Sequence, residues 1–487
     1  MSVRAAALLA MLSQYISFAI GLAASIYLAR YYIDPEALGL FTIAFAATQL
    51  IALFQDFGVT RYIAGEKDLT PERIHTAFTL SLLIAWAIAA LAMLGAWPIS
   101  WLYGLPGLLP VMLVIGASYI FVPFAIVPMA LRQREMDFAS NTMVEVGTAA
   151  ANAAVSILLA MRGLEALALA WGAFAQQVAR AVIAQWRNGL FLPLRPRFEG
   201  MAPILHFGTG SSALVLSGAL GGRIPELLLG RLLNEAAVGL YSRALGLAGQ
   251  LRQLVSGAVA SVFYPAFARV RDRGEPLGPP YERVVACYCG VTWPAMAGLA
   301  LVSEPLIRLV YGEAWLGAAP LLRWLALSQM CFVALPLHVE LPILLGRMKA
   351  LVHRNLLDTL ASVVLLALGA WQSLEWAAAS RLAYGLVWIA IYAGFLSRII
   401  GFSGRNLLAA YLRSGLATLA SIAPLALIFA FWREPSSVGF GELLIGTGLG
   451  IALWLLVLVA IRHPLAVEIR GMAEGPLRRL RSRRTRA

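Results

Sequence analysis

Apolar stretches long enough to cross a lipid bilayer follow one another along nearly the whole chain, separated by short polar segments. A helix needs roughly 20 apolar residues to span the hydrocarbon core. We place fourteen such spans, at 8–32, 38–62, 75–100, 108–130, 139–160, 163–186, 203–229, 236–263, 282–303, 319–345, 355–374, 376–398, 409–431 and 440–461. The pattern therefore predicts an all-α polytopic membrane protein.

Composition agrees with this pattern, because 60% of the residues are hydrophobic, 13% are charged and the mean hydropathy is +0.78. The net charge of +13 alone would suggest a nucleic-acid partner, but the distribution of charge points elsewhere. One set of alternate loops holds 26 of the 38 Lys and Arg residues, whereas the opposite loops hold five, namely Arg30, Arg162, Arg231, Arg308 and Arg433. Basic loops face the cytoplasm. Both termini are therefore predicted in the cytoplasm, which requires an even number of spans, and no nucleic-acid partner is expected.

A short pattern occurs twice in the chain. Leu-Ala-Arg30 precedes Gly39-Leu-Phe, and some 200 residues later Leu-Gly-Arg231 precedes Gly239-Leu-Tyr. Short glycine matches also arise by chance in hydrophobic chains, but six spans separate the two copies, which is typical of parallel repeats. The predicted regions are an N-lobe at 1–186, a cytoplasmic linker at 187–202, a C-lobe at 203–400, an appended helix pair at 401–462 and a basic tail at 463–487. The tail is expected to lie against anionic lipid headgroups.

Span five carries a stripe of polar residues. Asn141, Glu145, Thr148, Asn152 and Ser156 are spaced so that they share one face of a helix. Such a stripe does not face lipid. Helix–helix hydrogen bonding would explain Asn, Ser and Thr, whereas the acid among them favours a water-filled cavity.

Spans seven and eight contain arginines that are hard to explain as anchors, and two of them, Arg223 and Arg243, sit in the outer halves of their spans. Arg252 lies near the bilayer midplane, where an unpaired charge costs about 2.5–3.5 kcal/mol on insertion scales. Arg223 has Glu226 three residues later, so a local ion pair is as good an explanation as ligand binding.

The arginines of span eight face different directions. Arg243 shares a helix face with Gln250 and Gln253, whereas Arg252 lies about 180° away. The two arginines are therefore not expected to line one cavity unless the helix is broken or they lie at its edges.

Acidic residues lie in the cytoplasmic halves of three spans, at Asp56, Glu145 and Glu340. A buried carboxylate there is a candidate for H⁺ or Na⁺ coupling, or it pairs with a neighbouring arginine. The three cysteines and five histidines lack the spacing of metal ligands. We therefore expect no metal and no cofactor beyond a coupling ion.

Three segments resemble a known family when they are taken in order along the chain. They are Gly39-Leu-Phe with Phe54-Gln-Asp-Phe-Gly58, then Pro128-Met-Ala-Leu-Arg-Gln-Arg-Glu-Met-Asp-Phe138, and then Gly239-Leu-Tyr-Ser-Arg-Ala with Phe263-Tyr-Pro-Ala-Phe267. They are similar to segments of bacterial polysaccharide and O-antigen flippases in the multidrug/oligosaccharidyl-lipid/polysaccharide exporter superfamily. The resemblance implies a secondary transporter of the bacterial inner membrane with two six-helix lobes and two further helices.

The resemblance also implies a substrate and partners. Such proteins carry undecaprenyl-diphosphate-linked oligosaccharides from the inner to the outer leaflet by alternating access, for surface polysaccharide assembly. Their partners include membrane lipids and the polymerase and glycosyltransferases of the same pathway. Because arginine forks bind phosphate oxygens and amides suit sugars, the expected substrate-binding residues are Arg223, Arg243, Arg252, Asn141, Asn152, Gln250 and Gln253.

Parts of the sequence are also compatible with other functions. A membrane glycosyltransferase or polymerase could use the acidic pair of Asp34-Pro-Glu36, but this segment is more typical of a helix start. A cation-coupled drug exporter would favour an acidic cavity, whereas the arginines suit an anionic substrate. A peptidoglycan-precursor flippase is a closer alternative. The chain has no nucleotide-binding fingerprint, so ATP is not expected to drive it.

Overall fold

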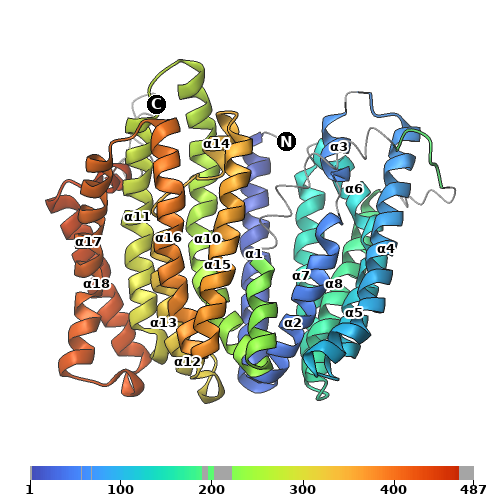
Figure 1. Cartoon of the computed structure of the whole chain (residues 1–487), viewed down its shortest axis with the longest axis horizontal. Helices are drawn as coiled ribbons and strands as arrows, with labels where there is room; N and C mark the ends of the chain where they lie inside the picture. Colours follow the sequence, from blue (N-terminus) through green and yellow to red (C-terminus); the bar gives the residue numbers. More distant parts are fainter. Residues whose placement is uncertain are drawn as a thin grey trace, which may run out of the picture. The chain divides into compact units, whose positions relative to one another are not determined.

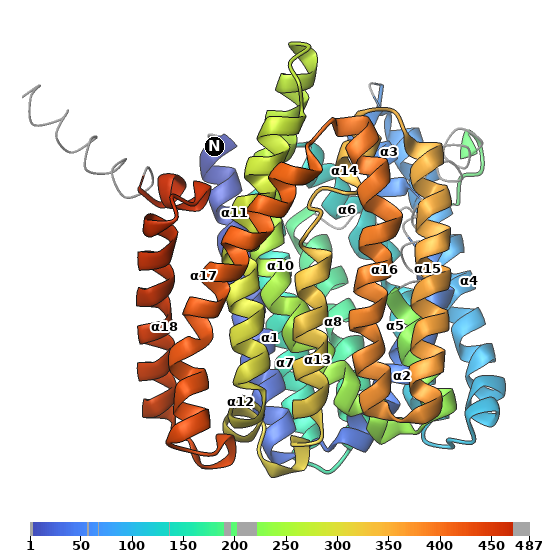
Figure 2. The ribbon, with the colours of Figure 1, turned by 60° about the vertical axis from the view of Figure 1, so that its left-hand side comes forward.

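The computed structural model describes residues 3–55, 58–66, 68–135, 137–188, 196–201 and 222–470. Within these ranges all regular secondary structure is helical (Figure 1, Figure 2). The predicted all-α class is therefore confirmed. By compactness the chain divides into two units, Met1–Ser242 and Arg243–Ala487.

The helices of the first unit are α1 (Val3–Tyr31), α2 (Pro35–Ile51), η1 (Ala52–Phe54), α3 (Val59–Gly65), α4 (Pro71–Tyr103), α5 (Leu108–Ser118), η2 (Tyr119–Phe121), α6 (Pro123–Arg134), α7 (Phe138–Ala160) and α8 (Glu165–Asn188). In this unit, α8 packs against α2, α5, α6 and α7. α7 packs between α1 and α8, while α5 packs against α8, α2 and α4 (Figure 1). α6 packs against α8 on one side and α3 on the other.

The second unit begins inside α10 (Glu235–Asp272), whose first turns belong to the first unit. Its other helices are α11 (Gly278–Leu301), α12 (Ser303–Val310), η3 (Glu313–Trp315), α13 (Ala318–Phe332), α14 (Glu340–Leu344), α15 (Met348–Gln372), α16 (Leu374–Ile400), α17 (Gly404–Phe431), η4 (Pro435–Ser437) and α18 (Phe440–Ala460). Five packed pairs connect them in the order α18, α17, α11, α13, α16 and α15 (Figure 2).

Short polar residues begin several helices. The Asp34 carboxylate accepts a hydrogen bond from the Ala37 backbone N–H at 2.8 Å, and Pro35 occupies the first helical position. This cap satisfies one of the amide groups that a helix start leaves without a partner. The interpretation of Asp34-Pro-Glu36 as a turn and helix start is confirmed.

The structure interrupts three of the predicted spans, and one of them, at 108–130, is the bent pair α5 and α6. The span expected at 38–62 ends as a regular helix at Ile51, and α3 follows only at Val59. The span expected at 319–345 ends at Phe332, because Pro336 has no N–H to donate to the carbonyl of the residue four positions earlier. Most of the span expected at 203–229 lies outside the described residues.

The part of the chain that the structure describes has nine helices long and apolar enough to cross a membrane, or ten when the bent pair α5 and α6 counts as one. α2 is a shorter apolar helix. The predicted count of fourteen is therefore not confirmed, although a protein that crosses the membrane many times is.

Large apolar side chains are exposed along the outer faces of several helices. Leu360 in α15, Leu416 in α17 and Leu456 in α18 are each more than half exposed. Contiguous surfaces of this kind are rare on soluble monomers, whereas lipid-facing helices require them. Five of the exposed tryptophans lie near helix ends that are predicted to face outward, at Trp97, Trp101, Trp371, Trp376 and Trp432, as is typical of the interfacial aromatic belt.

The boundary between the compact units differs from the predicted lobe boundary. It falls between Ser242 and Arg243 rather than in the linker expected at 187–202. The start of α10 contacts α2, which groups it with the first unit. Residues 189–195 and 202 of the linker and 471–487 of the basic tail lie outside the described residues. The N-lobe, C-lobe and appended pair stay predictions.

Candidate functional site

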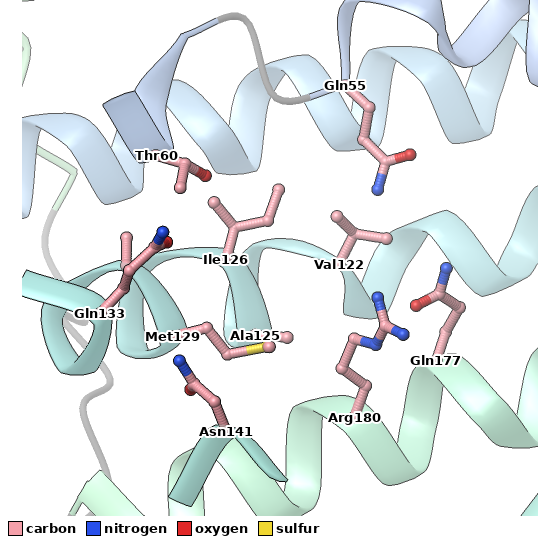
Figure 3. Close-up of a pocket in the computed structure, with 11 residues that line it drawn as sticks. Gln55, Thr60, Val122, Ala125, Ile126, Met129, Gln133, Asn141, Gln177 and Arg180 are labelled. Carbon is pink, nitrogen blue, oxygen red and sulfur yellow. The ribbon is translucent and has the colours of Figure 1, made fainter. Parts of the chain in front are cut away.

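A polar pocket lies inside the first unit, between α3, α6, α7 and α8. Its volume is about 220 Å³. Apolar side chains of α6 form one wall, and polar side chains surround the rest, at Gln55, Thr60, Gln133, Asn141, Gln177 and Arg180. Gln55 approaches from one side, while Asn141, Gln177 and Arg180 approach from the opposite side (Figure 3).

The polar atoms of this pocket are only partly satisfied. Arg180 Nε and Asn141 Oδ1 are buried and form no hydrogen bond with the described residues. Buried polar atoms nearly always have a partner in native proteins, so such atoms in a pocket indicate a place for water or a ligand. Arg180 Nη2 does lie 3.6 Å from Glu145 Oε2, but both side chains are partly exposed. Exposed ion pairs contribute about 0–1 kcal/mol, so an anionic ligand can compete for Arg180.

Buried hydrogen bonds hold α6 against α8 behind the pocket. Arg132 Nη2 donates to the Ala184 carbonyl oxygen at 2.7 Å, and Gln185 Nε2 donates to the Phe124 carbonyl oxygen at 2.8 Å. Both donors are almost fully buried. Hydrogen bonds between membrane helices contribute roughly 0.6–2 kcal/mol each, and these two fix the distance between the helices that carry the pocket.

The polar stripe predicted on span five is divided by the structure. Asn141 lines the pocket and Glu145 lies beside Arg180. Further along α7, Asn152 Nδ2 donates to Gln176 Oε1 of α8 at 3.2 Å, and Ser156 is buried. One end of the stripe therefore borders a cavity, while the other joins two helices. The expected roles of Asn141 and Asn152 in substrate binding stay predictions.

Arg223 has the local partner that its sequence context suggested. Arg223 Nη1 lies 3.6 Å from Glu226 Oε2, and the guanidinium lies 5.3 Å from the centre of the Phe45 ring. Glu226 is buried. The local ion pair is thus present, and a role of Arg223 in binding substrate stays a prediction.

Arg243 and Arg252 contact different groups, as their helical spacing predicts. The Arg243 guanidinium lies 4.8 Å from the ring centres of both Tyr311 and Trp315, and Trp315 is fully buried. Arg252 is close enough to His338 to interact with it electrostatically. Gln250 and Gln253 are exposed. None of these residues lines the polar pocket.

The predicted coupling acids lie in different places. Glu145 borders the pocket of the first unit, and Glu340 begins α14 in the second unit, where it is half-buried. Asp56 lies outside the described residues. Ion coupling by any of them stays a prediction.

Sequence reasoning missed two groups of residues. Arg180 lies close enough to the end of the span at 163–186 to serve only as an anchor. However, Gln176, Gln177 and Arg180 share a polar helix face, and this face was the signal that could have indicated the pocket. The second group joins α15 to α16. Tyr384 Oη donates to Asp358 Oδ1 at 2.7 Å, and Arg381 Nη1 donates to Ser362 Oγ at 2.7 Å.

The second unit also has pockets, but they differ in chemistry from the polar one. A pocket of about 380 Å³ between α10, α11, α17 and α18 has no charged side chain among its described lining residues. Another pocket, of about 510 Å³, lies between α11, α17 and the segment after α18. Its charged lining residues are Arg283, Arg413 and Glu282. In that pocket Arg283 Nη2 already pairs with Glu468 Oε1 at 2.7 Å, and the Glu282 carboxylate would repel an anion. The pocket around Arg180 is therefore the better site for an anionic, hydroxyl-rich ligand, since arginine binds phosphate oxygens and amides bind hydroxyls.

Curated proteins similar to this chain take part in polysaccharide biosynthesis. The lipopolysaccharide biosynthesis protein WzxC of Escherichia coli (strain K12) is 25% identical over 330 residues, which cover 66% of this chain and 65% of WzxC. The succinoglycan biosynthesis transport protein ExoT of Rhizobium meliloti (strain 1021) is 24% identical over 306 residues, which cover 61% and 60%. The match spans less than two-thirds of either relative.

A solved structure shows a similar fold. The lipid II flippase MurJ, in its inward closed conformation, superposes with a TM-score of 0.76 and 13% sequence identity over 93% of this chain and 99% of MurJ. The relatives whose names state an activity are transporters and not enzymes.

A family model described as "polysaccharide biosynthesis protein" matches residues 27–320, which is more than half of the chain. The similarities to WzxC and ExoT agree with this match and cover comparable shares of the chain. The protein therefore belongs to the polysaccharide biosynthesis protein family.

Proposed function

We propose that this protein is a secondary transporter that moves an undecaprenyl-diphosphate-linked oligosaccharide from the inner to the outer leaflet of the bacterial cytoplasmic membrane. Alternating access moves the headgroup, and both termini lie in the cytoplasm. Membership of the polysaccharide biosynthesis protein family and the similarity to a named transport protein support this proposal. The glycan would then serve surface or exopolysaccharide assembly.

The observation that carries the proposal is the pocket around Arg180. It combines an arginine with three glutamines, an asparagine and a threonine. Arg180 supplies a fork of donors for a diphosphate, and the amides supply hydrogen bonds for sugar hydroxyls. Residues Gln133, Asn141 and Arg180 lie within about two turns of helix ends that the positive-inside rule predicts to be cytoplasmic. A substrate made in the inner leaflet would meet this pocket first.

Glu145 connects the pocket to ion coupling. Its carboxylate lies 3.6 Å from the Arg180 guanidinium, so a diphosphate bound to Arg180 would repel it. Uptake of H⁺ or Na⁺ by Glu145 would relieve that repulsion. Binding of substrate and cation at this place would then favour each other.

A leaflet assay tests the proposed function. The purified protein is reconstituted into liposomes that contain an undecaprenyl-diphosphate-linked oligosaccharide, and a membrane-impermeant glycosidase added outside reports which leaflet holds the glycan. We expect the protein to make the inner-leaflet pool accessible, and to do so faster with an imposed H⁺ or Na⁺ gradient. Empty liposomes and heat-inactivated protein serve as controls.

The same assay distinguishes the nearest alternative. Liposomes loaded with lipid II are run in parallel. Transport of lipid II together with no transport of several undecaprenyl-diphosphate-linked oligosaccharides would overturn the proposal in favour of a peptidoglycan-precursor flippase.

A further inference from the structure

The starts of α2 and α10 are two copies of one segment. Asp34-Pro-Glu-Ala-Leu-Gly-Leu-Phe-Thr42 aligns without gaps with Asn234-Glu-Ala-Ala-Val-Gly-Leu-Tyr-Ser242, a constant offset of 200 residues. The two copies use the same helix cap. Asp34 Oδ1 accepts from the Ala37 N–H at 2.8 Å, and Asn234 Oδ1 accepts from the Ala237 N–H at 2.8 Å. The likeness therefore extends from sequence to local geometry.

These two segments cross each other at their glycines, inside the first compact unit. A Cβ atom added to Gly39 would overlap the Glu235 carbonyl oxygen and lie 2.9 Å from Gly239 N. A Cβ atom added to Gly239 would overlap the Pro35 carbonyl oxygen and lie 3.1 Å from Gly39 N. The glycine of each segment therefore contacts the equivalent residues of the other segment. Two copies related by a two-fold axis make contacts of this kind.

One polar contact accompanies the glycines. Thr42 Oγ1 and Ser242 Oγ lie 3.4 Å apart. Each hydroxyl also bonds to its own helix, because Thr42 Oγ1 donates to the Leu38 carbonyl at 2.8 Å and Ser242 Oγ to the Gly239 carbonyl at 3.2 Å. These helix bonds survive separation of the helices, and a single neutral hydrogen bond contributes about 0.5–1.5 kcal/mol. Separating the two helices would therefore break this one side-chain hydrogen bond between them, which is a small free-energy cost.

The crossing lies on the side opposite the N-terminus of α1. The turns that precede it follow Arg30 and Arg231, two of the few cations in the loops predicted to be outside. α10 is 38 residues long, and it continues from the crossing to Asp272, near the predicted cytoplasmic side. Movement at the crossing would therefore be carried by a continuous helix along the depth of the membrane.

We propose that the crossing of Gly39 and Gly239 is the outer gate of the transporter, which closes by close contact of two equivalent helix starts and separates to release the glycan headgroup. The proposal rests on the proposed function for its cargo. It assigns the gate to Gly39, Gly239, Thr42 and Ser242, residues outside the Arg180 pocket. Small residues are required there because any side chain at either glycine would hold the helices apart.

A reversible cross-link tests the gate. Thr42→Cys and Ser242→Cys are combined in a chain in which the three native cysteines, at Cys287, Cys289 and Cys331, are replaced by alanine. Oxidation is expected to join the two cysteines and lower the transport of the leaflet assay at least tenfold, and a reductant should restore it. Full cross-linking with unchanged transport would overturn the proposal.

A matched pair controls for the effect of a disulfide as such. Ser156 and Gly172 lie on α7 and α8, and the Ser156 Cβ is 3.2 Å from a Cβ built at Gly172. A cross-link between Ser156→Cys and Gly172→Cys joins helices that need not separate. We expect it to leave transport within twofold of the reduced protein.

A second variant tests the gate by cysteine labelling, which requires no substrate. Gly39→Leu should prevent closure, so that Thr42→Cys reacts at least fivefold faster with a membrane-impermeant maleimide added from outside. Gly21→Leu in α1, where nothing lies within 4 Å of an added Cβ, is the control. Unchanged labelling in Gly39→Leu would contradict the gate. Normal gating behaviour with no glycan transport would instead contradict only the proposed function.

Discussion

Arg180 differs from Arg223 and Arg243 because it borders a polar cavity that has room for a ligand. Arg223 has the buried Glu226 and the Phe45 ring, and Arg243 lies against Tyr311 and Trp315. Contacts with aromatic rings contribute about 0.5–2 kcal/mol, and they hold a guanidinium in place whether or not a substrate is bound. Arg180 instead borders a cavity with a weak, half-exposed acidic partner.

Substitution of Arg180 should therefore impair transport. Arg180→Gln removes the charge and the fork, and loss of a charged hydrogen bond costs about 1.5–3 kcal/mol, so we expect a fall in transport of about 10- to 100-fold. Arg180→Lys keeps the charge without the planar fork and should be intermediate. The leaflet assay measures the rates.

Arg323→Gln is the matched control for this experiment. Arg323 lies near the start of α13, and its side chain is exposed. Its loss should leave transport within about twofold. Normal transport by Arg180→Gln in a correctly inserted protein would remove the pocket from the mechanism.

At the scale of single elements, the pair α17 and α18 is packed through glycine. A Cβ atom at Gly450 would overlap the Ser421 carbonyl oxygen of α17, whereas a Cβ at Gly448 would meet nothing within 4 Å. Close approach of this kind is how membrane helices associate without a hydrophobic driving force.

Gly450→Leu should accordingly separate the two helices. Overpacking costs about 1–3 kcal/mol, and we expect a lower Tm in detergent micelles. Gly448→Leu changes the same residue type on the opposite face of the same helix and should leave Tm unchanged. Equal Tm values for both variants would contradict the packing described for α18.

The segment after α18 is held by a buried histidine. His463 is fully buried, Leu465 N donates to its Nδ1 at 3.2 Å, and Nε2 lies 3.2 Å from Ser414 Oγ. Nδ1 must therefore be unprotonated. Burial, and next the charge of Arg413, lower the pKa of His463 from 6.5 to about 4.

This arrangement predicts a loss of stability in acid. Between pH 6.5 and 4 the unfolded chain binds a proton that the folded chain does not, so the free energy of unfolding rises with pH across this window and falls on acidification. The slope is at most about 1.4 kcal/mol per pH unit. His463→Gln should flatten the dependence of Tm on pH in this range. An identical pH dependence in the variant and the wild type would show that His463 does not titrate as described.

At the scale of the whole molecule, the distribution of charge predicts the orientation in the membrane. Met161 follows α7 on the side predicted to be outside, and Glu275 lies between α10 and α11 on the side predicted to be cytoplasmic. Basic loops resist translocation, and the segment around Glu275 contains Arg269, Arg271, Arg273 and Arg283.

Single cysteines at these two positions check the orientation. In intact cells an impermeant maleimide should label Met161→Cys readily and Glu275→Cys only after permeabilisation. The protein with all three native cysteines replaced gives the background. The opposite labelling pattern would reverse the orientation and move the proposed gate to the cytoplasmic side.

Properties that depend on neighbours in the chain could be predicted without a structure. The all-α class followed from runs of apolar residues, and the helix start at Pro35 followed from Asp34, because span length and capping are local. The span expected at 38–62 was wrong as a continuous helix because Gly58 has a left-handed backbone with φ 77°, and the span expected at 319–345 was wrong because the helix ends before Pro336. The sequence shows that the pattern around Gly39 is repeated around Gly239. It does not show that the two copies contact each other in the folded protein.

Properties that depend on residues far apart in the chain required the folded molecule. Arg180 and Arg323 look alike in sequence, since both lie near span ends. α6, α7 and α8 surround the first with amides, whereas the second is exposed. Likewise, the helical period predicts that Asn141 and Asn152 lie on one face of α7. Only the position of α8 determines that Asn141 borders a cavity whereas Asn152 forms a hydrogen bond with Gln176. Periodicity states which face of a helix a residue occupies, and the neighbouring helices determine what that face meets.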